Sequence, residues 1–217
     1  MSIKTSEKYT YSEVMSKRKI IREKFPEIPH QGHRVVPGLD MTNINKALHF
    51  GSGPADEPNA EMMRNSFKEV ISVDHDPYAS ADFISLEEVP DNDFDMIISE
   101  HTIEHISFDD CAHLFCQFKS KLRANGSLFL TLPNIQNFGS WFCDYDHKNF
   151  TPWWDLCALL ELESFSVEHV FNWSGRQKSQ RLIPGEVEDF EQKIMTFLWQ
   201  NYGLSIADYV SIYAESR

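Results

Sequence analysis

The chain has 217 residues and a mass of 25.2 kDa, and its 20 lysines and arginines against 33 aspartates and glutamates give a net charge of −13. Its 41% of apolar residues excludes a disordered or a collagenous chain. No segment approaches the roughly 18 apolar residues of a membrane span, and the N-terminus has no apolar signal-peptide core. We therefore expect a soluble, cytoplasmic protein that makes no membrane contact.

Cysteine spacing and charge distribution exclude further classes. The four cysteines include no Cys-x-x-Cys pair, which argues against a disulfide framework and against a thiolate zinc site. Residues 1–34 carry a net charge of +4, so the remaining residues carry −17. Because so acidic a body repels phosphate backbones, we expect no long nucleic acid among its partners.

The pattern of apolar residues predicts an α/β fold. A helix is predicted over 11–24, where Thr10 and Glu13 have the spacing of a capping box and Pro26 follows. Later helices are predicted over 60–67, from a cap at Ser107 to a close at Asn125-Gly126, over 152–162 and over 187–198. Strands are predicted at 47–50, 70–73, 81–84, 94–99, 127–132, 165–171 and 209–214. This alternation indicates a doubly wound, mostly parallel sheet covered on both faces.

Two glycines and an aspartate give the first functional signal. Gly51 and Gly53 directly follow a predicted strand, and residues without a Cβ allow a tight turn and close approach of a ligand. Asp74 ends the next strand, 21 residues after Gly53, near the spacing at which a carboxylate binds both ribose hydroxyls. Since ligands bind outside the carboxyl ends of such strands, the pair predicts a nucleoside site.

The nucleoside predicted for this site carries no phosphate. A dinucleotide fingerprint needs a third glycine at position 56, where this chain has Asp56, whose carboxylate would repel a pyrophosphate. The sequence also lacks the Gly-Lys-Ser/Thr of a phosphate-binding loop. S-adenosylmethionine (SAM), which has a sulfonium, an ammonium and a carboxylate in place of phosphates, fits such a site.

Several short motifs are shared with a known family. They are His49–Gly53, Val73-Asp74, Asp82-Phe83, Pro90–His105, Gly126–Asn134 and Asp146–Pro152. With these motifs the chain resembles the class I SAM-dependent methyltransferases, especially the broad small-molecule type. The resemblance implies a Rossmann-like sheet of seven strands with an antiparallel last strand, SAM as cofactor and a small-molecule acceptor.

The resemblance also implies roles for individual residues. The glycine turn would pass under the methionine part of SAM, Asp74 would bind the ribose hydroxyls, and Asp82 with the Phe83 backbone would read the adenine edge. His49 stands where the family usually has an acidic residue that meets the SAM ammonium through water. The predicted cofactor-binding residues are His49, Gly51, Ser52, Gly53, Asp74, Asp82, Phe83, Ser99 and Glu100.

Two histidines are candidates for catalysis. Methyl transfer is an in-line displacement at the sulfonium carbon, so alignment in a dry pocket can supply most of the acceleration. A hydroxyl or amine acceptor must also lose a proton, which a nearby imidazole can assist. His101 is the first candidate because its loop should face the methyl group. His147 is the second, because its loop should return over the same crevice.

The sequence leaves a metal site open as an alternative. His101, Glu104 and His105 share one face at a helix start, and with His147 they could form a site of nitrogen and oxygen ligands. Small-RNA 2′-O-methyltransferases have a similar arrangement, but with Glu where this chain has His101. We predict that Glu104 and His105 stabilise the helix start and the loop instead, and that no metal is bound.

We divide the chain into an N-terminal helical cap, residues 1–45, and a methyltransferase domain, residues 46–217. The predicted activity is SAM-dependent methyl transfer to an oxygen or nitrogen of a small molecule. The alternatives are a SAM-binding interaction protein without catalysis, an enzyme similar to the small-RNA 2′-O-methyltransferases, and a nucleotide-dependent oxidoreductase. SAM binding without formation of S-adenosylhomocysteine would indicate the first, and protection by NAD the last.

Overall fold

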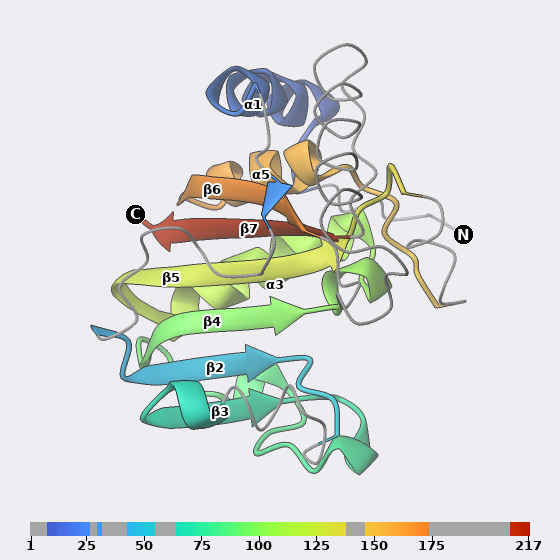
Figure 1. Cartoon of the computed structure of the whole chain (residues 1–217). Helices are drawn as coiled ribbons and strands as arrows, with labels where there is room; N and C mark the ends of the chain where they lie inside the picture. The colour runs from blue at the N-terminus through green and yellow to red at the C-terminus, as the bar shows by residue number, and fades with distance from the viewer. Residues whose placement is uncertain (1–7, 27–29, 32–42, 55–63, 138–145, 174–208) are drawn as a thin grey trace, which may run out of the picture.

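The computed structural model describes residues 8–26, 30–31, 43–54, 64–137, 146–173 and 209–217. Its centre is a seven-stranded sheet with the order β1-β6-β7-β5-β4-β2-β3 (Figure 1). The strands are β1 (His30–Gln31), β2 (Lys46–Phe50), β3 (Glu69–Val73), β4 (Phe94–Glu100), β5 (Leu122–Pro133), β6 (Phe165–Trp173) and β7 (Tyr209–Ser216). All neighbours pair in parallel except β7, which is antiparallel to both β5 and β6. The predicted reversal of the last strand is confirmed.

One strand of the seven differs from the prediction. Segment 81–84 forms only an isolated bridge between Phe83 and Val73, and the two-residue β1 completes the sheet beside β6. The physical reason lies in Asp82, whose Oδ2 accepts hydrogen bonds from the N–H and the hydroxyl of Ser72, both at 2.8 Å. This carboxylate fastens the segment to β3 through a side chain in place of a strand ladder.

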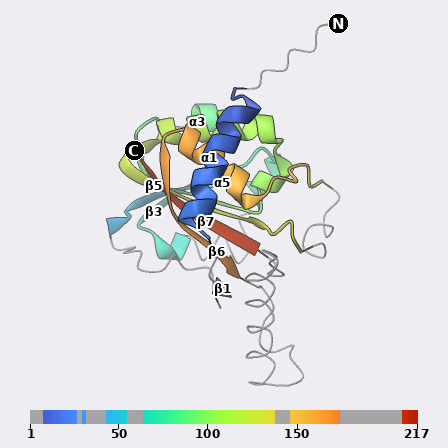
Figure 2. The ribbon, with the colours of Figure 1, turned by 90° about the horizontal axis from the view of Figure 1, so that it is seen from above.

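Helices cover one face of the sheet. Helices α3 (Phe108–Lys121) and α5 (Trp153–Leu162) pack on that face, and α1 (Tyr11–Lys24) packs against α5, on the same side in Figure 2. The predicted helix 11–24 is confirmed, including its capping box between Thr10 and Glu13, and its Ile21 is fully buried. The predicted helix 187–198 and most of the predicted helix 60–67 lie outside the described residues.

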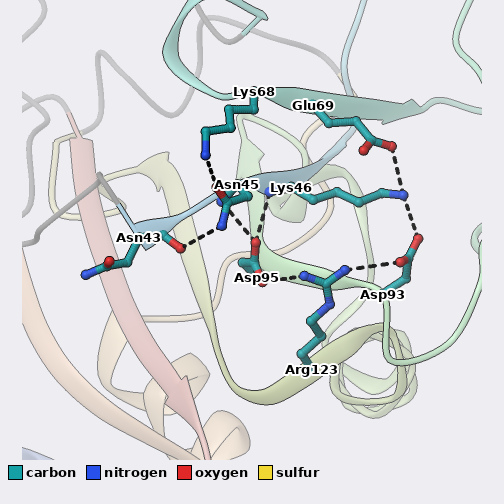
Figure 3. A network of polar contacts seen from close by, with 8 residues as sticks. All are labelled: Asn43, Asn45, Lys46, Lys68, Glu69, Asp93, Asp95 and Arg123. Atoms are coloured by element: carbon teal, nitrogen blue, oxygen red, sulfur yellow. Dashed lines mark hydrogen bonds and ion pairs between the residues drawn. The ribbon is translucent and has the colours of Figure 1, made fainter.

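Helix α3 ends earlier than the sequence predicts. It begins as expected at the Ser107 cap, but it ends at Lys121, and the chain passes directly into β5. Asn125 and Gly126, which were expected to close the helix, lie within β5, where the pairing register with β4 shifts. They therefore lie in an irregular part of the β4–β5 pairing. In the same part, Arg123 lies beside the start of β4 and contacts Asp95 (Figure 3).

Short helical turns follow the carboxyl ends of the strands. They are η2 (Pro77–Ala79), η3 (Leu86–Glu88) and η4 (Ile103–His105). Beneath them the central strands are buried on both faces, because Ile97 and its neighbour Ile98, whose side chains point to opposite faces, are both buried. Within the described ranges, no helix combines the length and the apolar character needed to cross a membrane.

Candidate functional site

A cavity of about 640 Å³ opens at the carboxyl ends of β2, β3 and β4. Gly51 and Gly53 line it after β2, Asp74 lines it after β3, and His101 lines it after β4. Four of the predicted site residues therefore come together around one cavity, at the edge where parallel sheets bind ligands. The other lining residues are Phe50, Val73, His75, Ile84, Ser85, Leu86, Glu87, Thr102, His105, Ile106, Leu114, Gln117, Asp146 and Lys148.

The two glycines act differently in the turn. Both have positive φ, +71° at Gly51 and +62° at Gly53, a conformation that favours glycine. A Cβ on Gly51 would lie 2.0 Å from the Thr102 hydroxyl oxygen, so this position must stay small for the chain to pack. A Cβ on Gly53 would meet nothing within 4 Å, so Gly53 keeps the cavity open.

Asp74 is fixed beside the glycine turn. Its Oδ2 accepts a hydrogen bond from the Gly53 N–H at 2.8 Å, and its Oδ1 accepts one from the Asp76 N–H at 2.9 Å. The side chain is only 11% exposed. Because each carboxylate oxygen has two lone pairs, both oxygens can still accept a ribose hydroxyl. Asp74 and the glycine turn thus form one preorganised cradle.

Asp82 and Phe83 do not line this cavity. Asp82 borders a smaller cavity of about 200 Å³ together with His49, Ser52 and Gly53. The Phe83 N–H donates to the Ser72 carbonyl at 3.1 Å, and the Phe83 carbonyl accepts from the Asp74 N–H at the same distance. The main cavity is lined instead by the three residues that follow, Ile84, Ser85 and Leu86. Adenine recognition by Asp82 and Phe83 stays a prediction.

His49 is buried on β2 and only 4% exposed. Burial lowers its pKa, against the opposing influence of the Glu100 and Asp74 carboxylates, and the Arg64 cation lowers it further. The imidazole is therefore neutral at pH 7. The position that usually holds an acidic residue in the family holds an uncharged side chain here.

Ser99 and Glu100 end the buried strand β4. Ser99 is fully buried, and its Oγ has no hydrogen-bond partner among the described residues. Glu100 is 7% exposed, and its carbonyl accepts a hydrogen bond from the Thr102 hydroxyl at 3.1 Å. A buried, unsatisfied hydroxyl is costly in a folded protein, and a bound ligand can satisfy it.

His101 is held in a defined orientation. Its φ of +54° is rare for a residue with a side chain, and its N–H donates to the Thr131 carbonyl of β5 at 2.9 Å. The ring packs edge-on against Tyr209 of β7, with 4.8 Å between the ring centroids. Its Nδ1 lies 3.4 Å from Glu104 Oε1. Strained backbone at a ligand cavity is a common feature of functional sites.

His147 lies beside the cavity without lining it. Its neighbours Asp146 and Lys148 do line the cavity, so the loop returns over the crevice as the sequence predicts. The His147 ring is 5.1 Å from the His105 ring, and the ligand atoms of Glu104, His105 and His147 lie within 4.8 Å of one another. The structure thus brings together three of the four groups that the sequence left open as metal ligands.

Residues 48–130 match a family model described as a methyltransferase domain. The match includes the glycine turn, Asp74 and His101, which meet at the cavity. Residues 48–130 are therefore a methyltransferase domain, and the structure has the fold of the class I SAM-dependent methyltransferases. S-adenosylmethionine is therefore its cofactor. A search with the methyltransferase sequence found no curated protein that matches it significantly.

Solved structures of methyltransferases share the fold. A SAM-dependent methyltransferase from Archaeoglobus fulgidus is 17% identical, with a TM-score of 0.62 and 94% of each chain covered. Phosphoethanolamine N-methyltransferase 2 from Haemonchus contortus, in complex with SAM, is also 17% identical, with a TM-score of 0.55 over 93% of this chain and 52% of that one. A SAM-dependent methyltransferase from Mesorhizobium loti is 13% identical, with a TM-score of 0.51 over 91% and 96%.

The residues present fit the cofactor of this methyltransferase. The open space beside Gly53 and the Asp74 carboxylate suit a ribose, and the unsatisfied Ser99 hydroxyl lies at the strand end where the methionine part is expected. Sequence reasoning missed Ser85, Leu86 and Thr102 in the cavity wall. Thr102 could have been found, because it directly follows His101, whereas no motif marks the other two.

Proposed function

We propose that this methyltransferase transfers the SAM methyl group to an oxygen or nitrogen of a small-molecule acceptor. The main support for this proposal is the 2.8 Å hydrogen bond from the Gly53 N–H to the Asp74 carboxylate, at a cavity that His101 also lines. The cavity volume of about 640 Å³ lies in the range of small-molecule sites. The strongly acidic body also disfavours a nucleic-acid acceptor.

We assign separate roles in cofactor binding and proton transfer to the residues around the cavity. Asp74 would hold the ribose hydroxyls, and the turn at Gly51–Gly53 would hold the methionine part, with Ser52, Ser99, Glu100 and His49 beneath it. SAM supplies an electrophilic methyl group on a cationic sulfur, whose charge disappears on transfer. The protein must then align the acceptor with that methyl group, exclude water and accept the acceptor's proton. His101 would accept the proton, because His101 lines the cavity and His147 does not.

We further propose that residues 1–45 act as a cap on a methyltransferase domain formed by residues 46–217. Helix α1 supports this division, because its one fully buried side chain, Ile21, packs into the core formed with α5. The Tyr9 hydroxyl donates to the Leu162 carbonyl at the end of α5, at 3.2 Å. Within the described residues 8–26, helix α1 therefore depends on its contacts with α5 for its position.

Calorimetric titration with SAM tests the cofactor cradle. Asp74→Ala removes two charge-assisted acceptors, so we expect SAM affinity to fall at least 30-fold, roughly 2 kcal/mol. Asp74→Asn, which keeps one acceptor oxygen, should fall in between. Glu88→Gln is the matched control, because Glu88 is an exposed acid on η3 that does not line the cavity. Equal SAM affinity in all four proteins would refute the assigned site.

Transfer of labelled methyl groups tests the acceptor class. The enzyme is incubated with methyl-labelled SAM and, in parallel, with a small-molecule cell extract and with total RNA. Label that enters the small-molecule fraction and depends on Asp74 supports the proposal. Label that enters RNA contradicts it, and SAM binding without any transfer would show a protein that binds the cofactor but does not catalyse.

A further inference from the structure

We propose that Glu104 is a positioning residue that orients the His101 imidazole as the base for the acceptor proton. The inference rests on the proposed methyl transfer for its chemical role. Its structural basis is independent of that role, since it consists of the burial of Glu104, the distance to His101 and the hydrogen bonds that fix both residues. The sequence predicts a structural role for Glu104, which is to stabilise the helix start and the loop.

The structure does not support that role at the helix start. Element η4 has three residues, and it begins at Thr102 without a side-chain cap. A macrodipole and unsatisfied N–H groups attract a carboxylate in a longer helix, but a single 3₁₀ turn offers little of either. Glu104 is also only 1% exposed, whereas a residue that stabilises a helix start normally remains in contact with water.

Glu104 is held firmly from the backbone. Its carbonyl accepts hydrogen bonds from the N–H of Lys148 at 2.7 Å and from the N–H of Asn149 at 2.9 Å. The Asn149 side chain in turn donates to the carbonyl of Ile103 at 3.3 Å. The loop 146–149 thus fastens η4, and with it the backbone from which the buried Glu104 carboxylate extends.

The buried carboxylate faces a histidine ring. Glu104 Oε1 lies 3.4 Å from His101 Nδ1, a separation of the kind that tightens when substrate binds. Glu104 Oε2 has no hydrogen-bond partner among the described residues. Burying an unsatisfied carboxylate oxygen costs folding free energy, and a functional role would explain why this cost is retained. A carboxylate only accepts hydrogen bonds, so it selects the tautomer with the proton on Nδ1 and the lone pair on Nε2.

The lone pair on Nε2 can then serve the reaction. The two nitrogens lie on different sides of the ring, and the ring lines the cavity while Tyr209 supports it. An acceptor hydroxyl or amine gives its proton to Nε2, its oxygen or nitrogen bonds to the methyl carbon, and the electrons of the carbon–sulfur bond pass to sulfur. The sulfonium becomes a thioether, and the imidazolium, stabilised by Glu104, later returns its proton to water.

Side-chain ¹H–¹⁵N spectra of the protein with S-adenosylhomocysteine bound test this proposal, because they show which ring nitrogen carries the proton. His101→Gln assigns the signals. We expect the Nδ1–H tautomer for His101 in the wild type and a shift towards the Nε2–H tautomer in Glu104→Gln. Glu163→Gln is the matched control, because Glu163 is a buried carboxylate at the end of α5 whose charge is paired with Lys8. It should leave the His101 signals unchanged.

Several results would overturn the proposal. They are an Nε2–H tautomer in the wild type, no change in Glu104→Gln, and a His101 signal that responds to a chelator but not to Glu104→Gln. The last would show that Glu104 serves a metal ion with His105 and His147 instead. If Glu104→Gln does not fold, Glu104→Asp replaces it, and we expect a mixed tautomer because the shorter side chain lengthens the contact.

Kinetics separate this inference from the proposed function. With an acceptor from the labelling experiment, Glu104→Gln should lower the turnover rate at least 10-fold while the dissociation constant for SAM changes less than 2-fold, and Glu104→Asp should recover part of the rate. Unchanged turnover in Glu104→Gln refutes the positioning role. A wild type that transfers no methyl group refutes the proposed function, and the tautomer experiment still decides whether Glu104 orients His101.

Discussion

The two ends of the central strands differ in how their charges are paired. At the amino ends, Lys46 bridges Glu69 at 2.8 Å and Asp93 at 2.7 Å, and Arg123 contacts Asp93 and Asp95 (Figure 3). At the carboxyl ends, buried oxygens of Ser99 and Glu104 lack a hydrogen-bond partner among the described residues. The first edge satisfies its polar groups within the chain, and the second leaves some of them for a ligand.

This difference indicates where the fold is stabilised and where it is kept ready for chemistry. At the amino edge, Asp95 also accepts hydrogen bonds from the N–H groups of Asn45 and Lys46, at 3.0 and 2.9 Å, and so ties the start of β2 to β4. At the carboxyl edge the backbone carries positive φ at Gly51, Gly53 and His101. Substitutions at the two edges should therefore separate stability from cofactor binding.

The largest effect is expected at Gly51. Gly51→Ala would add a Cβ 2.0 Å from the Thr102 hydroxyl oxygen and force alanine into a φ of +71°, so we expect a loss of about 2–4 kcal/mol of unfolding free energy. Gly53→Ala also forces alanine into a positive φ, but its Cβ meets no atom within 4 Å. We therefore expect it to lose about 1 kcal/mol of unfolding free energy and, because the new methyl group faces the cavity, to bind SAM more weakly. Urea unfolding and SAM titration measure both. Equal stability of the two variants would contradict this account of the turn.

A smaller effect is expected at Asp95. Although burial opposes it, the N–H groups of Lys46 and Asn45 and the Arg123 guanidinium hold the pKa of Asp95 below its usual range. The contribution of Asp95 to the free energy of unfolding is therefore fully present above the ordinary aspartate pKa near 3.9. It is lost as the pH falls through the lower pKa that Asp95 has in the folded state. We expect Asp95→Asn to lose roughly 1–2 kcal/mol at pH 7. The loss should shrink towards pH 3, and a loss of the same size at both pH values would exclude this electrostatic origin.

Ser99 tests the carboxyl edge directly. Because its Oγ is buried without a partner among the described residues, Ser99→Ala should leave the stability of the free protein unchanged or raise it by up to about 1 kcal/mol. If the hydroxyl serves SAM, the same variant binds SAM several-fold more weakly. Ser127→Ala is the control for SAM affinity, because Ser127 is a buried serine of the neighbouring strand β5 that pairs with Met96, nearer the amino end of β4. Thermal unfolding with and without SAM distinguishes the two effects.

The sequence was sufficient where local signals and topology agree. The capping box at Thr10 and the apolar strand 94–99 predicted helix α1 and strand β4, and the spacing from Gly53 to Asp74 predicted that these two residues lie together. The prediction of a strand at 81–84 was wrong because side-chain hydrogen bonds between Asp82 and Ser72 hold this segment. Contacts of this kind join distant segments and leave no trace in the periodicity of apolar residues. The start of β5 was missed for a similar reason, since Asp95 and Asp93 hold Arg123 at the sheet.

Part of the candidate site could be predicted from the sequence, and one of its contacts could not. Each strand end could be located, so the meeting of Gly53, Asp74 and His101 followed from the rule for parallel sheets. The contact between η4 and the loop 146–149 depends on backbone hydrogen bonds to the Glu104 carbonyl over more than 40 residues of chain. No motif encodes that contact, although the sequence already placed His101 and Glu104 on one face.

The smallest effect is expected at His49, which connects the two edges through β2. Burial lowers its pKa, against the influence of Glu100 and Asp74, so the folded protein holds the neutral imidazole while the unfolded chain takes up a proton near pH 6.5. The unfolded state then binds more protons, and stability falls as the pH drops below about 6.5, by at most about 1.4 kcal/mol per pH unit. His49→Gln should flatten this slope in urea unfolding between pH 7.5 and 5.5, while His113→Gln, at the exposed surface of α3, should not. A slope that survives in His49→Gln would assign the acid sensitivity to the carboxylates and not to the buried imidazole.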